Sequence, residues 1–155
     1  MKWYIVVGLT VLVCVTTLLV RIPIPGGGYF NLGDVMIVFC GLFYGWKVGL
    51  IAGGIGSALA DIIGFPVFAP ITLVAKGLEG LISGLAKKGN NLQSYLYPLL
   101  AVIVMVAGYF VGSWIFPNLG KAVAFADLPM NIVQAAVGFS GGRILFGAYK
   151  RITEE

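Results

Sequence analysis

The sequence predicts an all-α integral membrane protein, a compact bundle of six transmembrane helices that forms a single domain over residues 1–155. Of these residues, 59% are apolar and only 10% are charged, and the mean hydropathy is +1.00. A soluble domain of this size has no core large enough to bury so much apolar surface. A helix needs about 20 apolar residues to cross a bilayer, and six runs approach this length with only short connections between them. We therefore expect no soluble catalytic domain.

The six apolar runs follow one another along almost the whole chain. In order they are Trp3–Val20, Asn31–Tyr44, Lys47–Ile63, Pro70–Ala86, Tyr95–Phe116 and Leu128–Tyr149. The first run is too long for the apolar core of a signal peptide, and no small-residue cleavage site follows it, so we expect a retained helix. Cys14 and Cys40 fall within apolar runs, and we interpret them as buried thiols.

The connections at one end of the predicted bundle are more elaborate than those at the other. PIPGGG (23–28) contains two prolines and three glycines, which exclude a helix and predict a loop. A short aromatic loop from Phe65 to Phe68 follows the third helix, and KAVAFADLP (121–129) is long enough to fold over the same end. The opposite end has only a tight turn at YGWK (44–47) and the polar segment AKKGNNLQS (86–94). This inequality predicts a site that faces outward.

Basic residues are distributed unequally between the two ends. If the N-terminus is inside, two of them lie at the outer ends of helices, Arg21 and Lys121. Six lie at the cytoplasmic ends, namely Lys2, Lys47, Lys87, Lys88, Lys150 and Arg151. Cytoplasmic loops of membrane proteins carry an excess of Lys and Arg. We therefore predict six spans with both termini in the cytoplasm.

Small residues recur four positions apart within the predicted helices. The pairs are Gly49 with Gly53, Gly54 with Ala58, Gly80 with Gly84, and Gly138 with Gly142. Such spacing allows two helices to approach closely. We interpret these residues as packing contacts rather than as ligand contacts.

Five ionisable residues interrupt the apolar runs: Asp34, Asp61, Lys76, Glu79 and Arg143. Insertion scales put each at roughly 2.5–3.5 kcal/mol at a helix centre, so five isolated charges would cost on the order of 15 kcal/mol. Arg143 lies near the inner end and can extend its guanidinium to the interface. The other four need partners or a polar cavity.

The charges of the fourth predicted helix belong to one polar stripe. Thr72, Lys76, Glu79 and Ser83 stand at i, i+4, i+7 and i+11. A polar stripe on a span faces a neighbouring helix or a cavity. Two interpretations stay open: Lys76 and Glu79 neutralise each other and brace the bundle, or they orient a ligand, which is the hypothesis that we favour.

Polar residues of several helices reach a similar depth below the outer end. Lys76 and Gln134 each lie about 9 Å below the start of their helices at 1.5 Å per residue, with Asn131 above Gln134. Asp34 opens the second helix and Asp61 closes the third at the same end. Convergent polar groups in apolar surroundings are typical of a small-molecule pocket. The predicted substrate-binding residues are Tyr29, Asn31, Asp34, Asp61, Phe68, Lys76, Glu79, Trp114, Asn131 and Gln134.

No motif for chemistry accompanies the predicted pocket. The chain has no histidine, no cluster of metal ligands and no nucleophile with a base beside it. GLAKKGNN (84–91) lacks the glycine spacing and the hydroxyl of an ATP-binding loop. We expect a protein that binds or conducts a small molecule, is not an enzyme, and uses no cofactor, no metal and no nucleic acid.

Four segments together give a resemblance to a known family. They are NLGD (31–34), FYGWKVGLIAG (43–53), ALADIIG (58–64) and KGLEGLISGL (76–85). Their order and spacing, over nearly the whole chain, resemble those of the substrate-binding S components of energy-coupling factor (ECF) transporters. KGLEG looks most like the branch for hydroxymethylpyrimidine or pyridoxine.

The resemblance implies a subunit of an ABC-type importer in a prokaryotic plasma membrane, which captures a vitamin or vitamin precursor between the outer loops and the fourth to sixth helices. Its implied partners are a transmembrane coupling subunit and two cytosolic ATPase subunits, and the S component topples in the bilayer to carry its site inward. In that family an Ala-x-x-x-Ala face of the first helix docks to the coupling subunit. The nearest positions here are Gly8, Thr10 and Cys14, which depart from the alanine pattern.

Two other functions stay open from the residues alone. A stand-alone secondary carrier or channel would use the intramembrane carboxylates and Lys76 as an ion or proton relay, although neither broken helices nor two similar halves are evident. A structural membrane subunit would use the same charges only to fix helix register. Dependence of uptake on a separate ATPase module tests the first alternative, and binding of a small molecule to the isolated protein tests the second.

Overall fold

The computed structural model describes residues 2–88 and 91–154. Helices make up 84% of it, which confirms the all-α prediction. The described residues form six α-helices: α1 (Trp3–Leu19), α2 (Gly33–Tyr44), α3 (Trp46–Gly64), α4 (Ala69–Leu85), α5 (Gln93–Ile115) and α6 (Lys121–Glu154). Two short 3-10 turns flank α4, namely η1 (Pro66–Phe68) and η2 (Ala86–Lys88).

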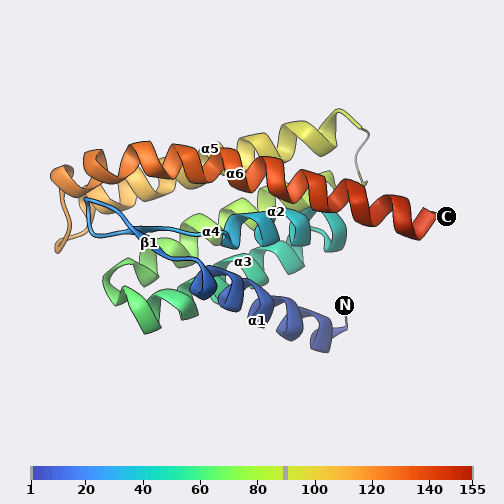
Figure 1. Ribbon diagram of the computed structural model, residues 1–155, viewed down its shortest axis with the longest axis horizontal. Coiled ribbons are helices and arrows are strands. Elements are labelled where there is room, and N and C mark those ends of the chain that lie inside the picture. Colours follow the sequence, from blue (N-terminus) through green and yellow to red (C-terminus); the bar gives the residue numbers. More distant parts are fainter. Residues whose placement is uncertain (1, 89–90, 155) are drawn as a thin grey trace.

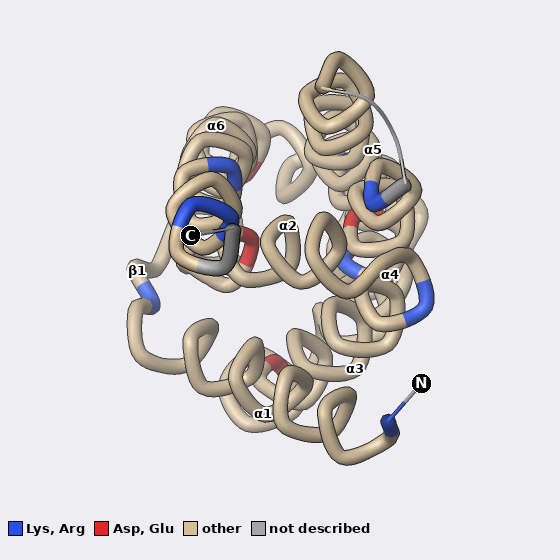
Figure 2. The backbone as a smooth tube through the Cα atoms, turned by 90° about the vertical axis from the view of Figure 1, so that its right-hand side faces the viewer, with Lys and Arg blue, Asp and Glu red and all other residues tan. Residues whose placement is uncertain are grey.

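The helices run roughly along one long axis, and both chain termini lie at the same end (Figure 1). We call this the termini end. Viewed from there, α1 and α3 form one side of the bundle and α5 and α6 the other, with α2 and α4 between them (Figure 2). The opposite end is called the hairpin end, because the connection between α1 and α2 carries a small β-hairpin there (Figure 1).

The hairpin consists of β1 (Ile22–Pro23) and β2 (Tyr29–Phe30), which pair in antiparallel register with Pro23 opposite Tyr29. The prediction that this segment is not helical is confirmed. Gly27, at φ 92°, lies in the turn, a conformation that glycine adopts without steric cost. The prolines and glycines therefore give the chain a compact turn instead of another helical run.

Four helical segments are long and apolar enough to cross a membrane: Trp46–Gly64, Pro66–Leu85, Gln93–Ile115 and Lys121–Ile152. α1 and α2 are shorter apolar helices of 17 and 12 residues. At 1.5 Å per residue, 12 residues reach about 18 Å, against about 30 Å for the hydrocarbon core of a bilayer. The six-span topology with cytoplasmic termini therefore stays a prediction.

The loop that we predicted over residues 121–129 is wrong. α6 begins at Lys121 rather than at Leu128, and it carries Pro129 in its interior. Three alanines between residues 122 and 126 favour helix, and a proline inside an apolar helix is tolerated where neighbouring helices support the backbone. Gly120, at φ 95°, ends the connection from α5. The hairpin end is therefore covered by the β-hairpin and by the first turns of α6.

Glycines bring helices into backbone contact. A side chain on Gly49 would overlap the carbonyl of Gly80, and a side chain on Gly80 would overlap the carbonyl of Gly49. Gly138 of α6 packs directly against the Cβ atom of Asp34. The interpretation of these glycines as packing contacts is confirmed. Gly45, at φ 92°, makes the predicted tight turn between α2 and α3.

Candidate functional site

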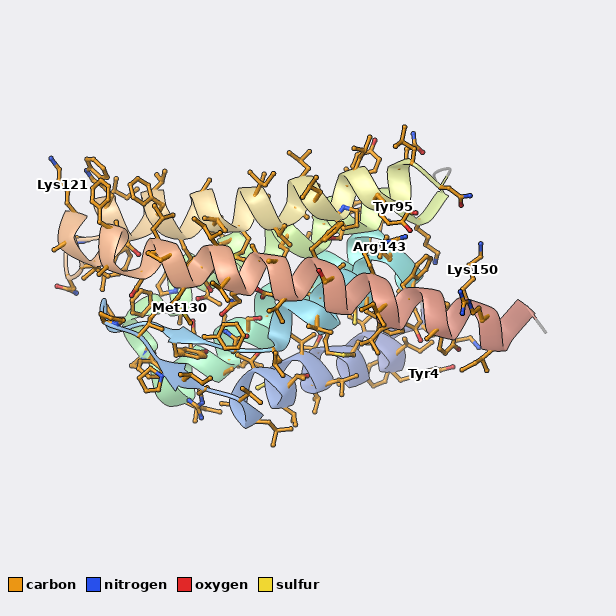
Figure 3. All side chains as sticks on the ribbon, turned by 45° about the horizontal axis from the view of Figure 1, so that its top comes forward. Tyr4, Tyr95, Lys121, Met130, Arg143 and Lys150 are labelled. Atoms are coloured by element: carbon orange, nitrogen blue, oxygen red, sulfur yellow. The ribbon has the colours of Figure 1, made fainter. Side chains whose placement is uncertain are left out.

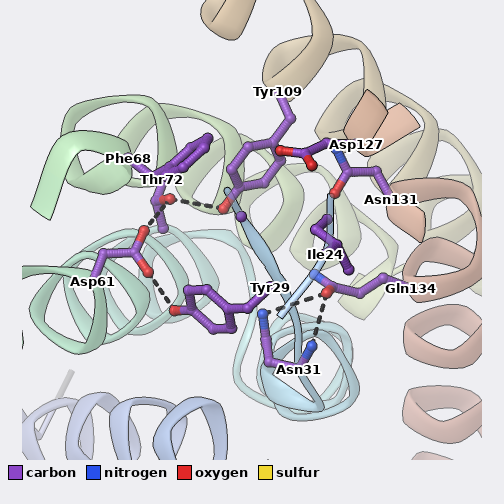
Figure 4. Close-up of a pocket in the computed structure, with 11 residues that line it drawn as sticks. Ile24, Tyr29, Asn31, Asp61, Phe68, Thr72, Tyr109, Asp127, Asn131 and Gln134 are labelled. Atoms are coloured by element: carbon purple, nitrogen blue, oxygen red, sulfur yellow. Dashed lines mark hydrogen bonds between the residues drawn. The ribbon is translucent and has the colours of Figure 1, made fainter. Parts of the chain in front are cut away.

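A cavity lies at the hairpin end, between the β-hairpin and helices α3 to α6 (Figure 4). Its volume is about 20 Å³, which is room for about one water molecule. The lining residues are Ile24, Gly28, Tyr29, Asn31, Asp61, Phe68, Thr72, Tyr109, Asp127, Asn131 and Gln134. The hairpin thus supplies one wall, and the cavity is too small for a vitamin in this conformation.

One side of the cavity is organised around the Asp61 carboxylate. Tyr29 of the hairpin donates its hydroxyl to one oxygen, and Thr72 of α4 donates to the other. The Thr72 hydroxyl lies 2.8 Å from that of Tyr109. The Tyr29 ring stacks on Phe65 with the ring centres 4.7 Å apart. One carboxylate therefore connects the hairpin to α3 and α4.

The Tyr29 hydroxyl is held in its donor form. Burial, and then the negative charge of Asp61, raise the pKa of Tyr29 well above its usual range. A phenol that stays protonated can only donate to a carboxylate at this position. The contact between the hairpin and α3 is therefore a charge-assisted hydrogen bond.

The opposite side of the cavity is organised around the Gln134 amide of α6. Its Oε1 atom accepts the backbone N–H of Asn31 at 2.9 Å, and its Nε2 atom donates to Asp34 at 2.9 Å. The Asn31 side chain accepts the backbone N–H of Gly33 at 2.8 Å. Gln134 thus connects the cavity to a set of charges beneath it.

These charges form what we call the charged layer, which consists of Asp34, Lys76 and Glu79. Lys76 donates a hydrogen bond to Asp34 of α2, and its ammonium nitrogen lies 3.6 Å from the Glu79 carboxylate. All three side chains are at most 1% exposed. Neither Glu79 oxygen has a hydrogen-bond partner among the described residues. The layer holds two carboxylates and one ammonium group.

The expected pairing within α4 therefore needs correction. Lys76 and Glu79 are near each other, as their spacing predicts, but the hydrogen-bonded partner of Lys76 is Asp34. The reason is tertiary: α2 places a second carboxylate next to the ammonium group, closer than the one on the same helix. Lys76 also lies 5.5 Å from the centre of the Tyr109 ring.

The structure divides the predicted binding residues into three groups. Six of them line the cavity: Tyr29, Asn31, Asp61, Phe68, Asn131 and Gln134. The three residues of the charged layer lie outside the lining. Trp114 lies apart, in an aromatic cluster with Phe110 and Phe125, and the Lys121 ammonium is 4.9 Å from its ring centre. The face of α5 that carries Trp114 is turned away from the cavity.

The predicted set lacks five lining residues, and Asp127 and Tyr109 are the ionisable ones among them; the others are Ile24, Gly28 and Thr72. Asp127 is 4% exposed, and its carboxylate lies so near the backbone of Gly26 that a side chain there would collide with it. Its Oδ1 atom makes no hydrogen bond of good geometry among the described residues, although the backbone N–H groups of Gly26 and Gly28 approach the carboxylate. Asp127 falls in the segment that is predicted as a loop, yet it shares one helix face with Asn131 and Gln134 at i, i+4 and i+7. This spacing of three polar residues is a sequence pattern that indicates a shared helix face.

The predicted docking positions on α1 differ in exposure. Gly8 is exposed, and a side chain there would meet nothing within 4 Å. Thr10 and Cys14 are half-buried, and the carbonyl of Thr10 approaches Gly56 of α3. Within the described part of the chain, no group of three or more His, Cys, Asp or Glu residues could hold a metal ion.

Comparisons with known proteins bear on the whole chain. Residues 3–151 match the family model described as "ECF-type riboflavin transporter, S component". A protein of Pyrococcus woesei, named "Uncharacterized protein in gap 3'region", is 47% identical over 144 residues, which cover 90% of this chain and 96% of that protein. The prediction of an ECF S component is confirmed, and this membrane-embedded chain belongs to the ECF-type riboflavin transporter S component family.

Proposed function

We propose that this chain is the substrate-binding subunit of an ECF-type importer, and that its ligand is an uncharged heteroaromatic vitamin with several hydroxyl or N–H donors. The name of the matched family favours riboflavin as that vitamin. Riboflavin has a flat ring system for the aromatic side chains and a hydroxylated chain for the polar ones. The chemistry of the cavity supports this class of ligand.

The observation that supports this proposal is that hydrogen-bond acceptors and aromatic rings line the cavity together, without a cation. Two carboxylates, Asp61 and Asp127, line the cavity, and no Lys or Arg is among its described lining residues. The rings of Tyr29, Phe68 and Tyr109 also line it. A ligand that brings hydrogen-bond donors would give the Asp127 Oδ1 atom a well-aligned partner, which it lacks among the described residues. A ligand that brings a phosphate would meet like charge.

Ligand entry requires the hairpin to move. The cavity of about 20 Å³ is far smaller than the 300–1,000 Å³ that is usual for small-molecule sites. Side-chain contacts attach the hairpin and the residue after it to the bundle: Tyr29 bonds to Asp61, Asn31 bonds to Gln134, and the turn at Gly26 packs against Asp127. These contacts can break without unfolding a helix.

Hydroxymethylpyrimidine and pyridoxine are the second candidates. They are uncharged or weakly basic single rings with hydroxyl donors, so they suit the same acceptors. The resemblance of KGLEG (76–80) to that branch favours them over a three-ring ligand.

Energy for uptake would come from partners. We propose that the chain has no enzymatic activity of its own and docks through α1 to a transmembrane coupling subunit, which carries two cytosolic ATPase subunits in a prokaryotic plasma membrane. Exposed Gly8 lies on the face of α1 that packs on no other described helix. The sequence has no ATP-binding loop.

Titration of the purified protein with four ligands tests the proposed ligand class. Riboflavin should bind at least about 100-fold tighter than flavin mononucleotide, or about 2.7 kcal/mol, because the two differ only by the phosphate. Asp127→Asn should reduce the ratio of the riboflavin affinity to the flavin mononucleotide affinity, because it removes one negative charge from the cavity. Tighter binding of pyridoxine or hydroxymethylpyrimidine than of riboflavin would make the second candidates the ligands. Equal affinity for both flavins would overturn the electrostatic argument, and binding of none of the four would overturn the proposal.

Reconstitution tests the role as a subunit. In vesicles the chain alone should not accumulate its ligand, and addition of the coupling and ATPase subunits with ATP should give concentrative uptake. Uptake by the chain alone, driven by a proton gradient, would instead favour the stand-alone carrier.

A further inference from the structure

A second groove lies between α5 and α6 near the termini end, far from the cavity under the hairpin. It has a volume of about 440 Å³ and is lined by Tyr95, Arg143, Ile144, Gly147, Ala148 and Arg151. We call it the basic groove. Tyr95 and Arg143 face each other there (Figure 3). Its size is within the range that is usual for small-molecule sites.

The Arg143 guanidinium in the basic groove is held in a fixed orientation. Its Nη1 atom donates to the backbone carbonyl of Ser94 at 2.9 Å and to the Ser94 hydroxyl at 3.0 Å. Its central carbon lies 3.6 Å from the centre of the Tyr95 ring. The Nε atom is buried and has no hydrogen-bond partner among the described residues. A guanidinium has five N–H donors, and both hydrogen bonds to Ser94 use Nη1, so the Nη2 side of an oriented group is left for a ligand in this groove.

Arg151 adds a second cation on the same side of α6. Arg143, Gly147 and Arg151 are four residues apart, so they lie on one face, with the two arginines about 12 Å apart along the helix axis. Arg151 is exposed. No carboxylate is among the described residues that line the groove. The basic groove therefore attracts an anion.

The rest of the groove is apolar, and so is the next groove along the same two helices. Ile144 and Ala148 belong to the basic groove. The apolar groove measures about 420 Å³ and is lined by Ile103, Val106, Ala107, Phe110, Leu128, Ile132 and Ala135. Ala135 and Arg143 are about 12 Å apart along α6. An anion-binding end and an apolar extension match an amphiphile better than a soluble anion.

We propose that the basic groove binds an anionic phospholipid, whose phosphate lies between Arg143 and Arg151 and whose acyl chain extends toward the apolar groove. Arginine suits phosphate because its planar guanidinium can donate two hydrogen bonds to it. Basic pockets between membrane helices bind acidic headgroups in this way. The groove is on the side of the bundle opposite α1 (Figure 2), so a lipid there leaves the proposed docking helix free.

Native mass spectrometry of the purified protein with equal amounts of phosphatidylglycerol and phosphatidylcholine tests this proposal. The wild-type protein should retain phosphatidylglycerol at least about fivefold over phosphatidylcholine. Arg151→Gln should reduce that preference below about twofold, because it removes one of the two cations without touching the core. Lys121→Gln is the matched control, since it removes an exposed lysine at the opposite end, and it should leave the preference unchanged.

Further measurements distinguish a lipid phosphate from a soluble phosphate as the anion in the groove. Glycerol phosphate at millimolar concentration should not displace phosphatidylglycerol, because it has no acyl chain, and displacement would assign the groove to a soluble anion. Arg143→Gln should lose the preference too, with thermal unfolding recorded because Arg143 also contacts Ser94. An unchanged lipid preference in Arg151→Gln would overturn the proposal. So would a variant that keeps its lipid preference but no longer assembles with the coupling subunit, because Arg151 would then serve docking.

Discussion

Replacing Lys76 by methionine removes the cation of the charged layer. Lys76 donates to Asp34 and lies 3.6 Å from Glu79, and none of the three side chains is more than 1% exposed. Methionine is of similar length, so the change tests charge more than volume. In the variant, Asp34 would keep the Gln134 amide at 2.9 Å as a donor. Glu79, which already has no hydrogen-bond partner among the described residues, would also lose the nearby positive charge.

The expected loss of unfolding free energy follows from these two carboxylates, which would be left without a cation. Removing one partner of a buried ion pair costs about 3–5 kcal/mol. Because Lys76→Met leaves two carboxylates without their cation, we expect the upper part of that range, about 4–5 kcal/mol of unfolding free energy. The second change Asp34→Asn removes one of the stranded charges. The double variant should therefore be more stable than Lys76→Met by at least about 2 kcal/mol, a usual coupling between contacting residues.

Unfolding by sodium dodecyl sulfate in mixed micelles, followed by far-ultraviolet circular dichroism, measures these free energies. Lys121→Met is the matched control, because Lys121 is exposed, and its effect should stay within about 0.5 kcal/mol. A loss below about 1 kcal/mol in Lys76→Met, or a double variant no more stable than the single one, would refute the assignment of Lys76 as the compensating charge.

Three further variants test other contacts. Tyr29→Phe keeps the ring but removes the donor to Asp61, and it should lower the unfolding free energy by about 1–3 kcal/mol in the same assay; an unchanged value would show that the hydroxyl is dispensable. Gly80→Ala should cost about 1–3 kcal/mol through overpacking, whereas Gly8→Ala, with open space around it, should cost nothing; equal effects would contradict the backbone contact. Trp114→Ala should change ligand affinity less than about twofold, as measured by titration, since its side chain lies outside the cavity; a tenfold loss would place it in the site.

The helices could be predicted because each is a long apolar run. The one large error is at the start of α6: residues 121–129 are predicted as a connection and the helix from Leu128, while the alanines before Leu128 favour helix. As a consequence Asp127 was assigned to a loop and its position beside Asn131 was overlooked. Hydropathy detects where a helix is, but a proline inside it makes its first turns ambiguous.

The candidate site could be predicted only in part. Gln134 and Asp61 were identified because polar groups are costly in apolar runs. Tyr109 gave no such signal, since an aromatic residue is ordinary in a span. Trp114 is on the same helix as Tyr109, and the choice between them depends on how α5 is rotated, which its nearly uniform apolar surface does not determine. The partner of Lys76 likewise depends on how α2 is placed against α4.

The 12-residue α2 has a consequence for where the vitamin would be held. A helix of about 18 Å leaves about 12 Å of a 30 Å hydrocarbon core to be filled by other parts of the chain. In the six-span topology that we predict, the β-hairpin that precedes α2 would fill that depth, and irregular backbone is tolerated there only where protein shields it from lipid. The candidate cavity would then be a recess within the membrane, where the dielectric constant is low and each hydrogen bond to a ligand is stronger than at the water surface. A ligand would enter this recess from the aqueous side, since the helices around the hairpin separate it from the lipid.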